Sequence, residues 1–142
     1  MIQLLSGIKS ATAALAAERL RLDVVGQNIA NAQTTHGPDG KPYRRQMVSF
    51  ESFMDRSDPG PNGQGTPSVR ISKVEPDTKP PRTIYMPGHP DADPQGMVSM
   101  PDINIHEEMA DMIAASRAYE ANLAVVKSAR TLALQDLSIG KR

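Results

Sequence analysis

Apolar residues at the two ends of the chain recur at helical spacing. In the first part, Ile8, Leu15, Leu22 and Ile29 follow one another at intervals of seven. In the last part, spacings of four and three alternate along Ile105, Met109, Met112, Ser116, Tyr119, Leu123, Val126, Arg130, Ala133 and Leu137. Such heptad series are typical of helices that pack along one narrow stripe. We therefore predict two long terminal helices that pair as a coiled coil.

The boundaries of both helices are indicated by local signals. Pro101 precedes Asn104, which predicts an N-cap with Glu107 as its capping-box acid, so the second helix should run from about 104 to 139. At 1.5 Å per residue, that helix would be roughly 54 Å long. The first helix should end near Asn28 and Asn31, because asparagine tolerates the left-handed conformation that closes helices.

The middle of the chain cannot be helical. All 12 prolines lie between Pro38 and Pro101, and proline interrupts helices. Alternating apolar and polar residues predict strands at 47–51 and 68–74, with a weaker one at 82–86, and 58–65 should be a loop. The predicted fold is α+β, with terminal segments 1–33 and 102–142 and a small proline- and glycine-rich β domain at 34–101.

The composition indicates a thin core. Hydrophobic residues make up 39% of the chain but aromatic residues only 4%, so a compact core would lack large side chains. Both predicted helices are longer than a β unit of this size is wide. They must be buried against each other, as an intramolecular helical hairpin, or against other chains.

The charge balance favours association. Lys plus Arg and Asp plus Glu number 16 each, which argues against a nucleic-acid module and removes the self-repulsion that keeps proteins apart. The beginning of the chain carries no basic segment before its apolar residues, so we expect no Sec signal peptide. No apolar run approaches the length of a membrane span.

The sequence offers little chemistry. There is no cysteine, which excludes thiolate catalysis and disulfides. Residues 88–102 place Asp91, Asp93, Gln95, Gly96 and Asp102 in an EF-hand-like register, but flanking prolines rule out the entering helix, and turn formation is the alternative interpretation. His36, His89 and His106 share no ligand spacing, and nucleophile-elbow and phosphate-loop motifs are missing. We therefore predict that the protein is not an enzyme and binds neither a cofactor nor a metal ion.

Two stretches carry a family resemblance. QNIANAQTT at 27–35, followed by PDGKPYRRQ at 38–46, resembles the N-terminal signature of bacterial flagellar axial proteins. HPDADPQGMVSMPDINIHEEMADMIAASRAYEAN at 89–122 is similar to the C-terminal signature of the proximal rod members of that family. The section from 56 to 82 carries no such motif.

The resemblance implies a structural subunit of the flagellar basal-body rod. Such proteins are exported by the flagellar type III system and assemble through their terminal helices into an axial drive shaft that crosses the periplasm. Partners would be further copies of the chain and the rod proteins FlgB, FlgF, FlgG and FliE.

The resemblance also implies assembly contacts at Ala30, Asn31, Thr34, Arg117, Tyr119, Glu120, Ala121 and Asn122. Alternatives are another rod or hook subunit of the same family, or a small secreted module that binds calcium through residues 88–102. The compact middle segment favours the proximal rod.

Overall fold

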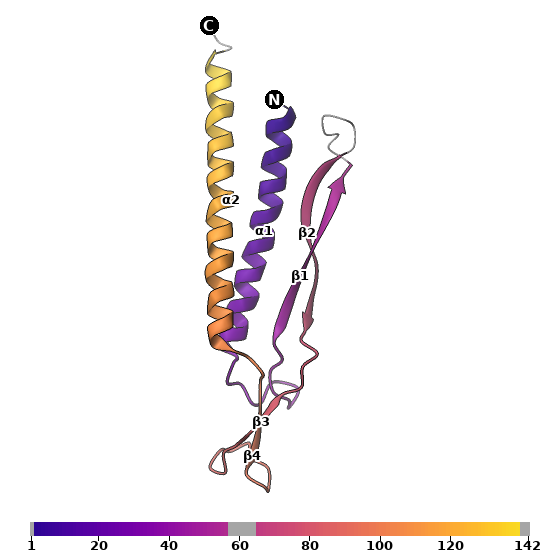
Figure 1. The fold of residues 1–142 in the computed structure, drawn as a ribbon, viewed down its shortest axis with the longest axis vertical. Coiled ribbons are helices and arrows are strands. Elements are labelled where there is room, and N and C mark those ends of the chain that lie inside the picture. The colour runs from indigo at the N-terminus through magenta and orange to yellow at the C-terminus, as the bar shows by residue number, and fades with distance from the viewer. Residues whose placement is uncertain (1, 57–64, 140–142) are drawn as a thin grey trace.

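The protein is elongated, with the start of its first helix and the end of its last helix at one end and its smaller sheet at the other (Figure 1). The computed structural model describes residues 2–56 and 65–139, in the order α1 (Ile2–Ala30), β1 (Gln46–Asp55), β2 (Thr66–Pro76), β3 (Arg82–Tyr85), β4 (Met97–Met100) and α2 (Ile105–Ile139). The combination of two helices with small antiparallel sheets confirms the predicted α+β class. None of the described helices is long and apolar enough to span a membrane.

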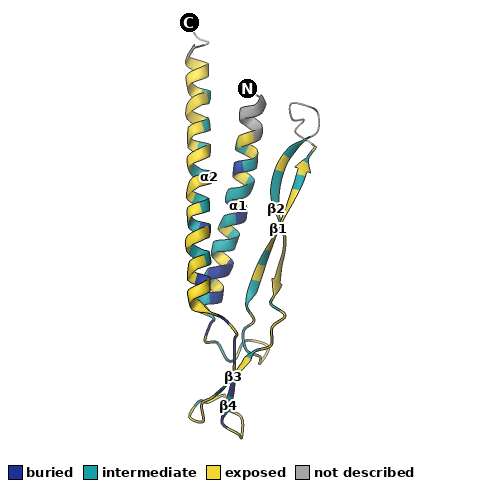
Figure 2. Ribbon diagram, in the orientation of Figure 1, coloured by how far each residue is buried: buried dark blue, intermediate teal, exposed yellow. Residues whose placement is uncertain are grey.

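Helix α1 is the central layer of the molecule. Helix α2 packs along one side of it, and the β1–β2 hairpin lies along the other (Figure 1). The buried apolar side chains on both helices are small, namely Ala11, Ala17, Val24, Val25 and Ala115. Figure 2 shows that most of α2 is exposed. The core is therefore thin, as the scarcity of aromatic residues predicted.

The β1–β2 hairpin has one apolar and one polar face. The antiparallel register pairs Val48 with Val74 and Phe50 with Ile71, and Ser72 forms a bulge. Residues that alternate along a strand share a face, so these four apolar side chains lie together. On the other face Glu51 pairs with Arg70 at 3.0 Å. The strands extend the predicted segments at 47–51 and 68–74, while most of the loop expected at 58–65 lies outside the described residues.

The second sheet, β3–β4, lies beyond the helices at the end opposite the termini (Figure 1). It contains the third predicted strand and pairs Arg82 with Met100 and Tyr85 with Met97. Val98, Met100 and Ile103 are buried here, so a second small core lies below the helices. Strand β4 was not predicted, because the aspartates and prolines of 88–102 dominated that stretch and its apolar run is only four residues long.

Helix α2 begins as expected. The Oδ1 atom of Asn104 accepts a hydrogen bond from the backbone N–H of His106 at 3.1 Å, which is the N-cap arrangement. Glu107 does not complete a standard capping box, since its Oε1 accepts a hydrogen bond from Asn104 Nδ2 at 3.0 Å. The cap and its acid are both present, with the acid bonded to the side chain of the cap.

Helix α1 ends differently from the prediction. The prediction of a left-handed residue at Asn28 or Asn31 was wrong, because positive φ angles among the described residues occur only at Gly40, Gly65 and Gly96. Instead, Asn31 Nδ2 donates a hydrogen bond to the Gln27 carbonyl at 2.9 Å. The same carbonyl also accepts the backbone N–H of Asn31 at 3.0 Å, and the Ala32 N–H donates to the Ile29 carbonyl at 3.3 Å, so the helix ends in a tightened last turn.

We expect Gly96→Ala to destabilise the β3–β4 hairpin by about 1–2 kcal/mol, because an L-residue is strained in the left-handed region. Gly96 has φ 78°, and an added Cβ would lie 2.9 Å from Tyr85 Cε2. Hydrogen exchange at the β4 amides measures the effect. Gly88→Ala is the matched control, since its Cβ would meet nothing within 4 Å. Equal protection in both variants would contradict the prediction.

Candidate functional site: a buried polar junction

A cluster of hydrogen-bonded polar side chains joins α1, the start of β1 and the start of α2. We call it the polar junction, and it comprises Asn28, Tyr43, Arg45, Gln46 and Glu108. Asn28 and Glu108 are each only 1% exposed, although both are polar. Buried polar groups are costly unless they are paired, so their arrangement needs an account.

Asn28 makes all four hydrogen bonds available to an amide side chain. Its Oδ1 accepts the Gln46 backbone N–H at 2.8 Å and the Tyr43 hydroxyl at 3.0 Å. Its Nδ2 donates to the Gln46 carbonyl at 2.9 Å and to Glu108 Oε2 at 3.0 Å. The amide therefore bonds both backbone groups of Gln46, as a neighbouring strand would, and fixes β1 against the last turn of α1.

Glu108 carries the only full negative charge of the junction. Arg45 Nε donates to its Oε1 at 2.6 Å, and Asn28 occupies its Oε2. Both carboxylate oxygens thus have a charged or polar donor, which a buried carboxylate requires. Helix α2 is held to α1 and to the segment before β1 through this one side chain.

Three further ion pairs extend the polar junction along the helices. Arg21 Nη2 donates to Asp111 Oδ1 at 3.2 Å, and Arg45 Nη2 lies 3.8 Å from Asp111 Oδ2. Glu18 lies 3.9 Å from Arg21 Nη1. Because these side chains are partly exposed, each pair adds little stability by itself. Together they align α2 along α1.

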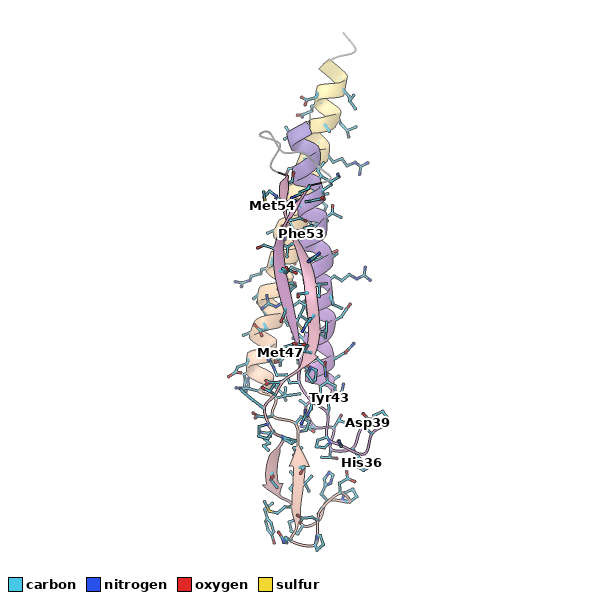
Figure 3. The ribbon with its side chains drawn as sticks, turned by 90° about the vertical axis from the view of Figure 1, so that its right-hand side faces the viewer. His36, Asp39, Tyr43, Met47, Phe53 and Met54 are labelled. Carbon is cyan, nitrogen blue, oxygen red and sulfur yellow. The ribbon has the colours of Figure 1, made fainter. Side chains whose placement is uncertain are left out.

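Tyr43 is affected by its place in the polar junction. Burial of the ring raises the pKa of the phenol above its ordinary 10.0, and the negative charge of Glu108 raises it further. Figure 3 shows Tyr43 just below the helices, above the loop that carries His36 and Asp39. The phenol therefore stays protonated and donates to Asn28.

The predicted contact residues on α1 and in the following turn differ in exposure. Ile8, Leu15, Leu22 and Ile29 are half-buried, and Ala30 is exposed. Asn31 and Thr34 are brought together, since Thr34 Oγ1 donates to Asn31 Oδ1 at 3.2 Å. The Thr34 carbonyl also accepts the Tyr43 backbone N–H at 3.1 Å, which links the helix end to the polar junction.

The face of α2 that meets α1 is offset from the predicted series. Buried or half-buried positions recur at Glu108, Met112, Ala115, Tyr119, Asn122, Val126, Ala129 and Ala133, and Asp111, Ser116, Ala118 and Leu123 beside them are also half-buried. Met112, Tyr119, Val126 and Ala133 belong to both series, whereas Ile105, Met109, Arg130 and Leu137 are exposed and Leu123 is half-buried. Arg117 and Glu120 are exposed and Asn122 is half-buried. Most residues on this face are small or polar, while Ile105, Met109 and Leu137 remain exposed.

No member of the polar junction is predicted from the sequence as a buried contact. Asn28 is predicted only as part of the helix end. One available signal was the position of Glu108, seven residues before Ala115 and four before Met112. Its placement in a heptad series with apolar residues indicates burial, but its partner becomes known only from the fold.

The geometry does not support the calcium alternative. The described residues hold no group of three or more His, Cys, Asp or Glu side chains that could bind a metal ion. Asp93 Oδ1 accepts the backbone N–H groups of Gln95 and Met97, each at 2.8 Å, and Asp91 Oδ2 accepts the Thr35 hydroxyl at 2.7 Å. Turn formation, the other interpretation, accounts for Asp93, whereas Asp91 is bonded to a residue distant in the sequence.

We expect Glu108→Gln to weaken the polar junction by about 2 kcal/mol, since Arg45 loses its closest anion while the shape of the side chain is kept. The readout is hydrogen exchange at the amides of Gln46 and of the first turns of α2. Glu120→Gln, an exposed position on the same helix, serves as the control. Unchanged exchange in Glu108→Gln would show that the ion pair does not hold the elements together.

We expect Tyr43→Phe to lower the free energy of unfolding by about 1 kcal/mol at pH 8, because Asn28 loses a hydrogen-bond donor. The folded pKa of Tyr43 is raised, so its contribution is complete below pH 10 and is lost as the pH rises through that raised value. The difference between wild type and variant should therefore shrink above pH 10 in urea titrations. Exposed Tyr85→Phe should show no such trend.

Comparison with known proteins gives a consistent result. Residues 8–38 match the family described as "Flagella basal body rod protein", and residues 95–138 match "Flagellar basal body rod FlgEFG protein C-terminal". The first match includes Asn28 and the second includes Glu108, so each covers one member of the polar junction.

Curated relatives resemble the chain over nearly its whole length. "Flagellar basal-body rod protein FlgC" of Borreliella burgdorferi is 43% identical and covers 96% of this chain and 97% of its own. The protein of the same name from Yersinia enterocolitica is 39% identical over 99% and 100%, and that of Bacillus subtilis 36% over 90% and 92%. The chain therefore belongs to the FlgC family of flagellar basal-body rod proteins and is a structural subunit of the rod.

Proposed function

We propose that this subunit builds the proximal rod by burying the outer faces of its two helices against neighbouring subunits. The observation that carries the proposal is an excess of surface. The chain exposes 9994 Å², whereas a compact monomer of 15.4 kDa exposes about 7,200 Å². The difference, about 2,800 Å², is as large as the area buried in an extensive protein–protein interface.

The exposed apolar residues support the same proposal. Among the described residues, seven large apolar side chains are exposed on α2, at Ile105, Met109, Ile113, Val125, Leu132, Leu134 and Leu137. By their spacing, Ile105, Met109, Ile113, Leu134 and Leu137 fall on one side of the helix, and an exposed apolar patch of this kind marks an interaction surface. The half of the predicted heptad series that α1 leaves uncovered would pair with a neighbour's helix as a coiled coil.

The remaining parts of the proposal follow from the family. The neighbours would be further copies of the chain and the rod proteins FlgB, FlgF, FlgG and FliE, which together form a drive shaft across the periplasm. Export would use the flagellar type III system rather than a Sec signal. We infer a mechanical role without enzymatic activity, with Ala30, Asn31, Thr34, Arg117, Tyr119, Glu120 and Asn122 among the assembly contacts.

We expect Leu123→Asp to prevent incorporation into the rod, because a charge without a partner in a buried helix interface costs several kcal/mol. The amount of variant in isolated basal bodies, measured by mass spectrometry in a strain lacking the wild-type copy, is the readout together with swimming. Ser128→Asp adds the same charge on the opposite side of α2 and is the control. Normal swimming with Leu123→Asp would contradict the proposed assembly surface.

A further inference from the structure

The small sheet β3–β4 is attached to the rest of the chain at two places. Among the described elements, β3 and β4 contact each other and no other helix or strand. The first attachment is apolar and lies next to α2, where Pro101 is fully buried and Ile103 is only 4% exposed. The second is polar and lies in the loop 86–96, which joins the two strands at the end of the sheet away from α2. A body held at two points keeps one orientation, whereas a body held at one point can turn.

Asp91 forms the polar attachment. Its Oδ2 accepts a hydrogen bond from the Thr35 hydroxyl at 2.7 Å, between residues 56 positions apart in the sequence. The Nδ1 atom of His36 lies 4.0 Å from the other carboxylate oxygen. Thr35 and His36 belong to the segment that follows α1, and Figure 3 shows His36 on the loop below the helices. We call Thr35, His36 and Asp91 the Asp91 latch.

The loop that carries Asp91 is bonded firmly to the small sheet. The Met86 backbone N–H donates to the Gly96 carbonyl at 2.8 Å, which continues the antiparallel pairing of β3 and β4 into the loop. Within the loop, His89 Nδ1 accepts the backbone N–H of Asp91 at 3.1 Å. These bonds fix Asp91 relative to the two strands, so a movement of Asp91 away from Thr35 moves the whole sheet.

The other half of the latch is bonded to the end of α1 and to the polar junction. Thr34 Oγ1 donates to Asn31 Oδ1 at 3.2 Å, and the Thr34 carbonyl accepts the Tyr43 backbone N–H at 3.1 Å. The Tyr43 hydroxyl in turn donates to Asn28. Because Thr34 directly precedes Thr35, the latch connects the position of α1 with that of the small sheet.

The Asp91 latch is the weaker of the two attachments. The side chains of His36 and Asp91 are 65% and 35% exposed, whereas Pro101 and Ile103 are buried. Water competes for an exposed hydrogen bond and screens an exposed ion pair. The polar attachment therefore opens more readily than the apolar one.

We propose that the Asp91 latch is a releasable device that sets the orientation of the small sheet relative to the helices. With the latch closed, β3–β4 is held at both attachments and has one orientation. With the latch open, the sheet turns about the buried residues at 101–103, while the helices and the polar junction keep their places. The inference concerns the single chain and does not depend on the proposed assembly, so either can fail without the other.

Distances between two spin labels on the purified full-length chain test the latch. The chain has no cysteine, so labels can be placed at Thr83→Cys on β3 and Ala114→Cys on α2, both exposed positions. Double electron–electron resonance should give one narrow distance distribution when the latch residues are intact. Asp91→Ala and Thr35→Val should each broaden it about two-fold or more, because the open state becomes populated. A distribution that is already broad with the latch intact, or an unchanged width in Asp91→Ala, would overturn the proposal.

Matched variants separate the latch from a general effect of losing charge. Asp39→Ala removes an exposed carboxylate from the same segment and should leave the width unchanged. Asp91→Asn keeps an oxygen that accepts the Thr35 hydroxyl and should stay narrow. Thr35→Val combined with Asp91→Ala should be no broader than either alone, since both remove the same bond. Equal broadening in Asp39→Ala would contradict the latch.

A second label pair reports on the rest of the fold. Arg19→Cys on α1 and Ala114→Cys on α2 are both exposed, and the distance between their labels should be the same in every variant. A change in this distance in Asp91→Ala would show that Asp91 supports the packing of the helices, which would also contradict a latch that moves only the small sheet.

Discussion

The side-chain amide of Asn28 is the contact on which the arrangement of the elements depends. It bonds both backbone groups of Gln46, the hydroxyl of Tyr43 and the carboxylate of Glu108. No aliphatic residue could replace these four bonds, and each would leave a buried polar group unpaired if lost. Because the apolar core is thin, a saturated polar contact rather than apolar burial decides where β1 and α2 begin relative to α1.

The combination of polar contacts inside the chain with apolar side chains on its surface suits a subunit of a larger assembly. Residues of α2 that face α1 are mostly small or polar, such as Ala115, Asn122 and Ala129, and leave the large apolar side chains on the outside. Met109, Leu134 and Leu137 therefore stay exposed on α2. They belong to the surface that the proposed assembly would bury.

The elongated shape follows from the same constraint. The hairpin β1–β2 lies along α1 because Asn28 fixes its first residue there, and its apolar face is wider than one helix can cover. A groove remains between the hairpin and α2, at a level where charge is already concentrated. The β3–β4 sheet has its own small core of Val98, Met100 and Ile103 and does not contribute to the groove.

Strong local signals in the sequence predicted two long helices from heptad spacing, the N-cap at Asn104, and the strands around Val48 and Ile71. Heptad spacing also predicted a contact face on α2, but periodicity shows that a face is buried without showing which element covers it. The structure shows that Met112, Tyr119, Val126 and Ala133 lie on the face of α2 that also carries Glu108. The polar junction could not be predicted for a related reason. Asn28, Gln46 and Glu108 are up to 80 residues apart, and the burial of a polar residue depends on partners that only the fold brings near.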